Sequence, residues 1–281
     1  MMALKNLLVH LDDSKACESR IAVALALAEA HDAHLTGLAL AVEASLPSYI
    51  GGQLPPEILE MQRERARELG QAAVARFTKA VKASGRPTDC RMVDSLDVDA
   101  SRVIALHARY SDLAILGQAE PDDSASGMRR TLEEVVLSCG RPVLIIPYIG
   151  AGPNLGKRVV VAWDAGREAA RAVNDALPIL ERAKEVTVLT INPKSGPNGH
   201  GEEPGTDLAL HLARHGVKVE VQQSRGEEIG VGDALLSRVA DRGGDLLVMG
   251  AYGHSRLREV VLGGATRSIL EQMTIPVLMS H

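Results

Sequence analysis

The sequence is poor in aromatic residues and cysteine, and it has no excess of positive charge. Aromatic residues make up 2% of the chain, so stacking platforms for nucleic-acid bases are not expected. The formal net charge is -5, whereas a nucleic-acid surface needs clustered lysine and arginine. Cys17, Cys90 and Cys139 are isolated and lack metal-ligand spacing, which predicts reduced thiols. We therefore expect no nucleic-acid partner and no disulfide framework.

Long hydrophobic runs are missing as well. The most apolar run covers residues 21–30, and it carries Glu29 near its end. Because a membrane helix needs about 20 apolar residues, this run predicts a buried helix instead. We expect a cytoplasmic protein that does not enter a membrane. The 281 residues, of which 46% are hydrophobic and 24% charged, fit two globular domains.

The two halves of the chain resemble each other. The segment "NLLVHLDDSK" parallels "RVVVAWDAGR", which aligns Asp12 with Asp164 at an offset of 152 residues. The segment "SDLAILGQ" parallels "GDLLVMGA", which aligns Gly117 with Gly250 at an offset of 133 residues. Such self-similarity indicates a duplicated structural unit.

The repeat divides the chain into domains 1–150 and 151–281, joined by the linker "GAGPNLGK". The difference between the offsets leaves about nineteen additional residues in the first half. They fall where a long helix is predicted over residues 56–83.

Short apolar runs alternate with amphipathic runs along each half. In the second half they predict strands at 159–163, 186–191, 217–222, 246–249 and 277–279. They predict helices at 167–182, 207–214, 233–242 and 265–273. The strands are continuous Val, Leu and Ile runs, which is typical of parallel strands buried on both faces. The pattern predicts two tandem doubly wound α/β domains.

Open sheets of this class bind ligands outside the carboxyl ends of their strands. If the first and fourth strands of the second half are neighbours, Asp164 and the glycine-rich loop 250–264 face one crevice. The loop ends where the helix 265–273 begins, and a helix start offers free N–H groups to a phosphate. We therefore expect an adenine nucleotide, with its phosphates on the loop and its nucleoside near Asp164.

The segment "MGAYGHSRLREVVLGGAT" resembles the ATP-binding signature of the universal stress protein family. That signature spaces three glycines as Gly250, Gly253 and Gly263 are spaced here. The resemblance covers nearly the whole chain as two tandem domains. It implies five-stranded parallel sheets of order 3-2-1-4-5, a stress-related regulatory role, and ATP, AMP or ADP as ligand, with or without Mg²⁺. The expected nucleotide-binding residues are Ala162, Trp163, Asp164, Ile191, Met249, Gly250, Gly253, His254, Arg256, Gly263, Gly264, Ala265 and Thr266.

The chain departs from the family at two places. Gly264 stands where a serine or threonine usually follows the third glycine, although Thr266 offers a hydroxyl two residues later. In the first half, Glu120 stands where Gly253 would be, and Arg129 and Arg130 fall near the two later glycines. Negative charge near a phosphate is unfavourable, so we expect a degenerate motif without triphosphate in the first half.

No catalytic constellation emerges, and neither a catalytic residue nor a protein metal site is expected. His211 and His215 have a metal-ligand spacing, but a solvated helix face is the simpler interpretation. Asp164 has the alternative role of a helix cap. The functional hypotheses are a nucleotide-binding regulator, a scaffold that holds another small molecule or none, and, ranked last, an ATP-consuming enzyme.

The apolar strands near residues 143–146 and 277–279 predict sheet edges that need covering. A homodimer would cover them, and pairing between the two halves of one chain is the alternative.

Overall fold

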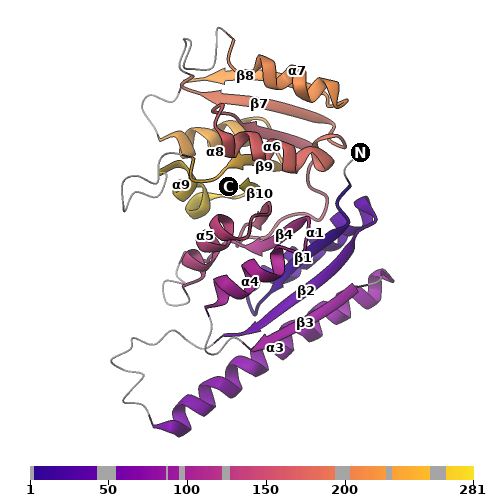
Figure 1. Cartoon of the computed structure of the whole chain (residues 1–281), viewed down its shortest axis with the longest axis vertical. Helices are drawn as coiled ribbons and strands as arrows, with labels where there is room; N and C mark the ends of the chain where they lie inside the picture. The colour runs from indigo at the N-terminus through magenta and orange to yellow at the C-terminus, as the bar shows by residue number, and fades with distance from the viewer. Residues whose placement is uncertain are drawn as a thin grey trace. The chain divides into compact units, whose positions relative to one another are not determined.

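A computed structural model of the chain divides into two compact units (Figure 1). It describes residues 3–42, 55–86, 88–94, 99–121, 127–193, 203–225, 230–253 and 264–281. The first unit consists of Leu4–Cys139 and Tyr148–Pro153, and the second is built from Gly140–Pro147 and Asn154–His281. These units differ from the predicted domains 1–150 and 151–281 in that Gly140–Pro147 is grouped with the second unit.

The second unit has a parallel sheet in the expected strand order. Its strands lie in the order β8-β7-β6-β9-β10, which is 3-2-1-4-5 along the chain. Residues 159–161 of β6 pair with β7 on one side and with β9 on the other. The carboxyl ends of β6 and β9 are therefore neighbours, as the crevice requires. The strands are β6 (Arg158–Ala162), β7 (Glu185–Ile191), β8 (Val219–Ser224), β9 (Leu246–Gly250) and β10 (Val277–Ser280).

The helices of the second unit alternate with these strands. α6 packs against β9 and β10, and α8 packs against α9. Their bounds, like those of the strands, lie within two residues of the predicted ones. The helices are α6 (Arg167–Leu180), α7 (Thr206–Arg214), α8 (Val231–Asp241) and α9 (Gly264–Gln272).

The first unit repeats this pattern with strand order β3-β2-β1-β4. Its long helix α3 (Pro56–Ser84) confirms the helix predicted over 56–83 and ends at Gly85, whose φ of 66° suits glycine. The other helices are α1 (Cys17–His31), α4 (Ala100–Ala108) and α5 (Met128–Ser138). The strands are β1 (Asn6–Leu11), β2 (His34–Ala41), β3 (Thr88–Asp94) and β4 (Leu113–Gly117).

The strand β5 (Val143–Ile146) explains why Gly140–Pro147 belongs with the second unit. It pairs antiparallel with β10, so that Val143 lies opposite Met279 and Ile145 opposite Val277. β10 also pairs with β9 and is therefore hydrogen-bonded on both sides. These two apolar strands thus cover each other within one chain, as the alternative to a homodimer predicted, and they no longer argue for a homodimer.

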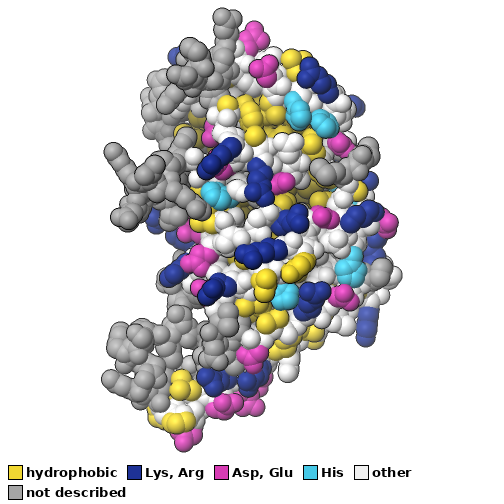
Figure 2. Space-filling model, viewed as in Figure 1, with side chains coloured by type: hydrophobic (Ala, Val, Ile, Leu, Met, Phe, Trp, Pro, Cys, Tyr) yellow, Lys and Arg dark blue, Asp and Glu magenta, His cyan; other side chains and the backbone are white. Residues whose placement is uncertain are grey.

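On the face shown in Figure 2, basic and acidic side chains are interspersed, in keeping with a formal net charge of only -5. The three cysteines are free thiols, of which Cys17 and Cys139 are buried and Cys90 is exposed. Within the described ranges, no helix combines the length and the hydrophobicity that a membrane span requires.

Candidate functional site

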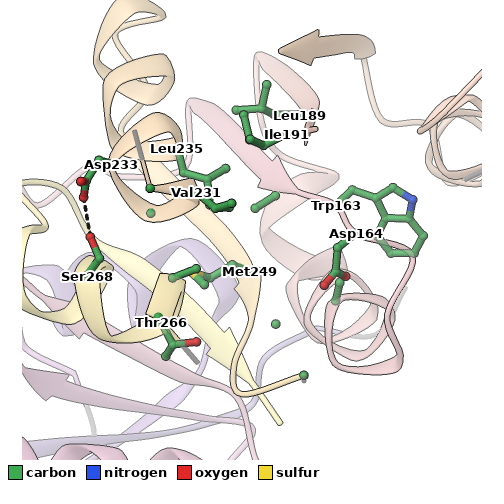
Figure 3. Close-up of a pocket in the computed structure, with 18 of the residues that line it drawn as sticks. Trp163, Asp164, Leu189, Ile191, Val231, Asp233, Leu235, Met249, Thr266 and Ser268 are labelled. Atoms are coloured by element: carbon green, nitrogen blue, oxygen red, sulfur yellow. Dashed lines mark hydrogen bonds between the residues drawn. The ribbon is translucent and has the colours of Figure 1, made fainter. Parts of the chain in front are cut away.

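A pocket of about 600 Å³ opens in the second unit at the carboxyl ends of β6, β7 and β9. Its size falls within the range of about 300–1,000 Å³ that small-molecule sites occupy. The first turns of α8 and α9 complete its wall (Figure 3). The pocket therefore lies at the crevice that the strand order predicts.

The pocket gathers most of the predicted binding residues. Those that line it are Ala162, Trp163, Asp164, Ile191, Met249, Gly250, Gly253, Gly264, Ala265 and Thr266. His254, Arg256 and Gly263 lie outside the described residues. The predicted set comes from four separate segments, which the sheet brings together.

Asp164 lines the pocket and fixes the turn before α6, although the helix cap expected as its alternative role is not formed, since no side chain caps α6. Its Oδ1 accepts a hydrogen bond of 2.8 Å from the amide of Gly166, just before α6 begins. In Figure 3 its carboxylate points toward the cavity, whereas the indole of Trp163 points away from it. The hydrogen bond within the turn is therefore compatible with a ligand-binding role of Asp164, because Oδ2 is left to face a ligand.

Unusual backbone conformations concentrate at this edge of the sheet. Ala165, Asn192 and Tyr252 have φ values of 58°, 48° and 59°, which side chains other than glycine rarely adopt. Each follows the carboxyl end of a different strand that borders the pocket, namely β6, β7 and β9. Such strained residues cost about 1–3 kcal/mol each and cluster at ligand sites.

Two of the signature glycines have a packing role that the sequence did not reveal. A Cβ on Gly250 would lie 2.6 Å from the carbonyl carbon of Glu168 and would also overlap the amide nitrogen of Ala169. A Cβ on Gly253 would lie 3.1 Å from Oε2 of Glu168. These glycines therefore let β9 and the residues after it approach the start of α6 closely.

Gly264 stands apart from the other two, because a Cβ there would meet no atom within 4 Å. It opens α9 and lines the pocket, so the bare backbone at this position faces open space. The nearby Thr266 is 4% exposed, and its hydroxyl oxygen accepts a hydrogen bond of 3.3 Å from the amide of Tyr252. That hydroxyl therefore already has a structural role in positioning the backbone.

The start of α8 was missed by sequence reasoning. Gly230, Val231 and Gly232 line the pocket, and no side chain caps the helix. Asp233 in the same turn accepts a hydrogen bond of 2.5 Å from the hydroxyl of Ser268 on α9 (Figure 3). The signal that could have revealed this wall is the pair of glycines around Val231, at a predicted strand-to-helix junction.

One wall of the pocket is apolar. It is formed by Leu189, Ile191, Val231, Leu235 and Met249, which come from β7, α8 and β9 (Figure 3). The N-terminal turns of α8 and α9 also border the pocket, and their free N–H groups and positive dipole ends favour an anion. The pocket therefore suits a ligand with a flat apolar part and a negatively charged part.

A buried carboxylate adjoins this site. The side chain of Glu168 is 7% exposed, and its Oε1 accepts a hydrogen bond of 2.6 Å from Nε of Arg167. Burial raises the pKa of Glu168, but the hydrogen bonds from Arg167 and from its own backbone amide outweigh burial, so the pKa lies below its usual range. An ionised carboxylate therefore lies beside Gly253.

Comparison with known proteins identifies the second half. The sequence model described as "Universal stress protein family" matches residues 156–281. The second half of the chain is thus similar to this family. Universal stress protein Slr1230 of Synechocystis sp. is 40% identical over 67 residues, which are 24% of this chain and 22% of that protein. The chain thus matches about a fifth of the length of this curated relative.

Solved structures extend the likeness to the whole fold. A universal stress protein from Archaeoglobus fulgidus has a TM-score of 0.70 at 17% identity, over 98% of this chain and 95% of that one. A protein from Pseudomonas aeruginosa, described as functionally unknown, has a TM-score of 0.62 at 14% identity, over 99% and 92% of the two chains. The predicted α/β fold with two tandem units is thereby confirmed.

Among the described residues, no group of three or more His, Cys, Asp and Glu side chains is placed to hold a metal ion. Asp233 lines the pocket, but its carboxylate is engaged by Ser268. Asp164 is the other carboxylate of the pocket wall, and it keeps one free oxygen.

Proposed function

We propose that the second unit binds an adenine nucleotide, ATP, ADP or AMP, and that the protein is a cytoplasmic regulator of the stress response. The observation that carries the proposal is the 600 Å³ pocket, which is lined by apolar side chains and by two helix N-termini. The match of residues 156–281 to the universal stress protein family supports the regulatory role.

The chemistry of the wall suggests how the ligand would lie. The base would rest against Ile191, Leu235 and Met249, where no charged side chain has to be desolvated. The free oxygen of Asp164 would accept a hydrogen bond from a ribose hydroxyl. The phosphates would lie toward the amides of Gly264 and Ala265, away from the Glu168 carboxylate beside Gly253.

Mg²⁺ would enter this pocket with the phosphates. Because the free oxygen of Asp164 is assigned to the ribose and Asp233 is engaged by Ser268, the ion would take its ligands from phosphate and water. When bound, the ion would offset the negative charge of the phosphates.

The proposal contains no turnover step. The free oxygen of Asp164 is assigned to the ribose, and Glu168 is engaged by Arg167, so the proposal gives neither carboxylate the role of a general base. Nucleotide binding would act instead by changing the conformation around the pocket or the choice of partner.

Titration with ATP tests the proposal, with Trp163 as the reporter because it is the chain's one tryptophan and borders the pocket. We expect its fluorescence to change and calorimetry to show saturable binding. Asp164→Asn is the matched variant, since the amide oxygen keeps the hydrogen bond to Gly166 but removes the charge, and we expect weaker binding. Absence of heat at millimolar ATP, with and without Mg²⁺, would refute the proposal.

A second candidate is a scaffold whose pocket holds a different small molecule or none. The packing of Gly250 and Gly253 against Glu168 favours it, because this packing accounts for two signature glycines without any ligand. Mass spectrometry of molecules released from the freshly purified, denatured protein separates the candidates. A released adenylate supports nucleotide binding, and a different molecule in stoichiometric amount supports the scaffold.

A further inference from the structure

The first unit buries an arginine at the place that corresponds to the nucleotide crevice. Arg20 of α1 is 1% exposed, although arginine is rarely buried unless it is paired. Its Nε donates a hydrogen bond of 2.8 Å to the carbonyl oxygen of His10, at the end of β1. Its Nη2 lies 2.7 Å from Oδ2 of Asp12. The guanidinium is therefore held at the carboxyl end of the first strand.

The same guanidinium occupies the space beside Gly117. A Cβ on Gly117, at the end of β4, would coincide with Nη1 of Arg20. β1 and β4 are neighbouring parallel strands, so Asp12 and Gly117 flank the point where the strand order reverses. Arg20 therefore lies between the two residues that would flank a ligand there.

The second unit differs at the equivalent position. Arg20 lies eight residues after Asp12, and eight residues after Asp164 lies Ala172, which is fully buried. Since Asp12 corresponds to Asp164 and Gly117 to Gly250, the repeat replaces a small side chain by a guanidinium. Beside Gly250 the second unit has Glu168 and Ala169 of α6 instead of a guanidinium, and Ala169 lines the pocket.

The surroundings of Arg20 satisfy its charge. The carboxylate of Asp12 also accepts hydrogen bonds from the amide and hydroxyl of Ser14, at 3.0 and 2.5 Å. Burial raises the pKa of Asp12, but Arg20, His10 and Ser14 outweigh it and lower the pKa to about 2. Asp12 therefore stays ionised as the partner of Arg20, and its oxygens are already engaged.

We propose that the crevice of the first unit is a guanidinium site filled from within by Arg20. If the second unit binds a nucleotide as proposed, it follows that one chain binds one nucleotide, because the first crevice is already filled. The ligand class of the first crevice is thus a planar cation that pairs with Asp12, the opposite of an anionic nucleotide.

Chemical rescue tests the site without any nucleotide. Arg20→Ala leaves a guanidinium-sized cavity beside Asp12, and we expect a clear loss of melting temperature. Millimolar methylguanidinium should raise the melting temperature of Arg20→Ala by several degrees, but not that of the wild type or of Arg20→Ala with Asp12→Asn. Tetramethylammonium is the control for charge without the planar fork.

Two outcomes of this experiment contradict the inference. If Arg20→Ala is as stable as the wild type, the fold does not need the guanidinium at this position. A folded Arg20→Ala that methylguanidinium does not stabilise would show that Asp12 holds no guanidinium. If Arg20→Ala does not fold, Arg20→Lys keeps the charge without the fork and should fold with a melting temperature that methylguanidinium leaves unchanged. Equal stability of Arg20→Lys and wild type would then refute the site.

Stoichiometry tests the consequence for nucleotide binding. We expect calorimetry to give one ATP per wild-type chain and none for Gly264→Glu, which places a carboxylate at the start of α9 in open space. Binding of two ATP per wild-type chain would overturn the inference and leave nucleotide binding intact. The same conclusion would follow if the double variant Gly264→Glu and Asp164→Asn still bound one ATP. No ATP on the wild type would refute the proposed function, while the rescue experiment would still decide the role of Arg20.

Discussion

The hydroxyl oxygen of Thr266 accepts a hydrogen bond of 3.3 Å from the backbone amide of Tyr252. This bond ties the first turn of α9 to the residues just after β9. Tyr252 is one of the strained residues at the pocket edge, with φ of 59°. In the sequence, Thr266 offers a hydroxyl that could replace the one missing at Gly264. Its position makes it a residue that holds the site in shape.

Replacing Thr266 by valine should show this positioning role, because valine keeps the shape and removes the acceptor. We expect the free energy of unfolding to fall by about 1 kcal/mol, the net contribution of one hydrogen bond. ATP affinity should fall as well, because Tyr252 and Gly253 lose their tether. Thr266→Ser should keep both properties. Urea denaturation and calorimetry make the measurement, and unchanged affinity of Thr266→Val would contradict the role.

Gly250 and Gly264 should respond oppositely to alanine. At Gly250 a Cβ would overlap the backbone of Glu168 and Ala169, so Gly250→Ala should destabilise the second unit by about 1–3 kcal/mol or more. At Gly264 a Cβ meets open space, so Gly264→Ala should leave stability within about 0.5 kcal/mol. Denaturant melts of the two variants make the comparison. Equal effects would show that the packing argument is wrong.

A hydroxyl at position 264 should strengthen nucleotide binding, if the second unit binds nucleotide as proposed. Gly264→Ser supplies the donor that the universal stress protein signature usually has, worth about 1 kcal/mol, or about fivefold in the dissociation constant for ATP. Gly264→Ala is the matched control, because it adds the Cβ without the hydroxyl. Calorimetry should rank serine above alanine, and equal affinities would mean that the phosphates lie elsewhere.

Much of the fold could be predicted because local and tertiary signals agree. Buried parallel strands read as unbroken apolar runs, and each helix of the second half has a clear amphipathic period. The pairing of β5 with β10 was one of two alternatives, and the sequence could not choose between it and a homodimer, since an apolar strand of four residues carries no information on which neighbour it pairs with. Its pairing with β10 is a tertiary choice.

The site was predicted only where the sequence has a motif or a repeat. Asp164 and Gly250 follow from the duplication, and Gly264 and Thr266 from the resemblance. The wall at Gly230–Asp233 could not be predicted in the same way, because its role depends on α8 packing against α9. The packing of Gly250 against α6 was likewise hidden, since a glycine that admits a neighbouring backbone reads the same as one that admits a ligand.

His10 should make the stability of the first unit depend on pH. Burial lowers the pKa of His10 to about 4 in the folded protein, against an ordinary value of 6.5. Between these values the unfolded chain binds a proton that the folded chain does not, so stability rises with pH. As the pH falls from 6.5 to 4, the free energy of unfolding should drop by on the order of 3 kcal/mol from this group.

His10→Gln separates this effect from that of Asp12. The variant should show a flatter free energy of unfolding between pH 4 and 6.5, since glutamine does not titrate. Below that window both proteins should lose stability alike, because Asp12, with a pKa of about 2 in the folded state, contributes stability that disappears as it is protonated. Urea denaturation at a series of pH values gives both slopes. A wild-type slope no steeper than that of His10→Gln would show that His10 is not held neutral by burial beside Arg20.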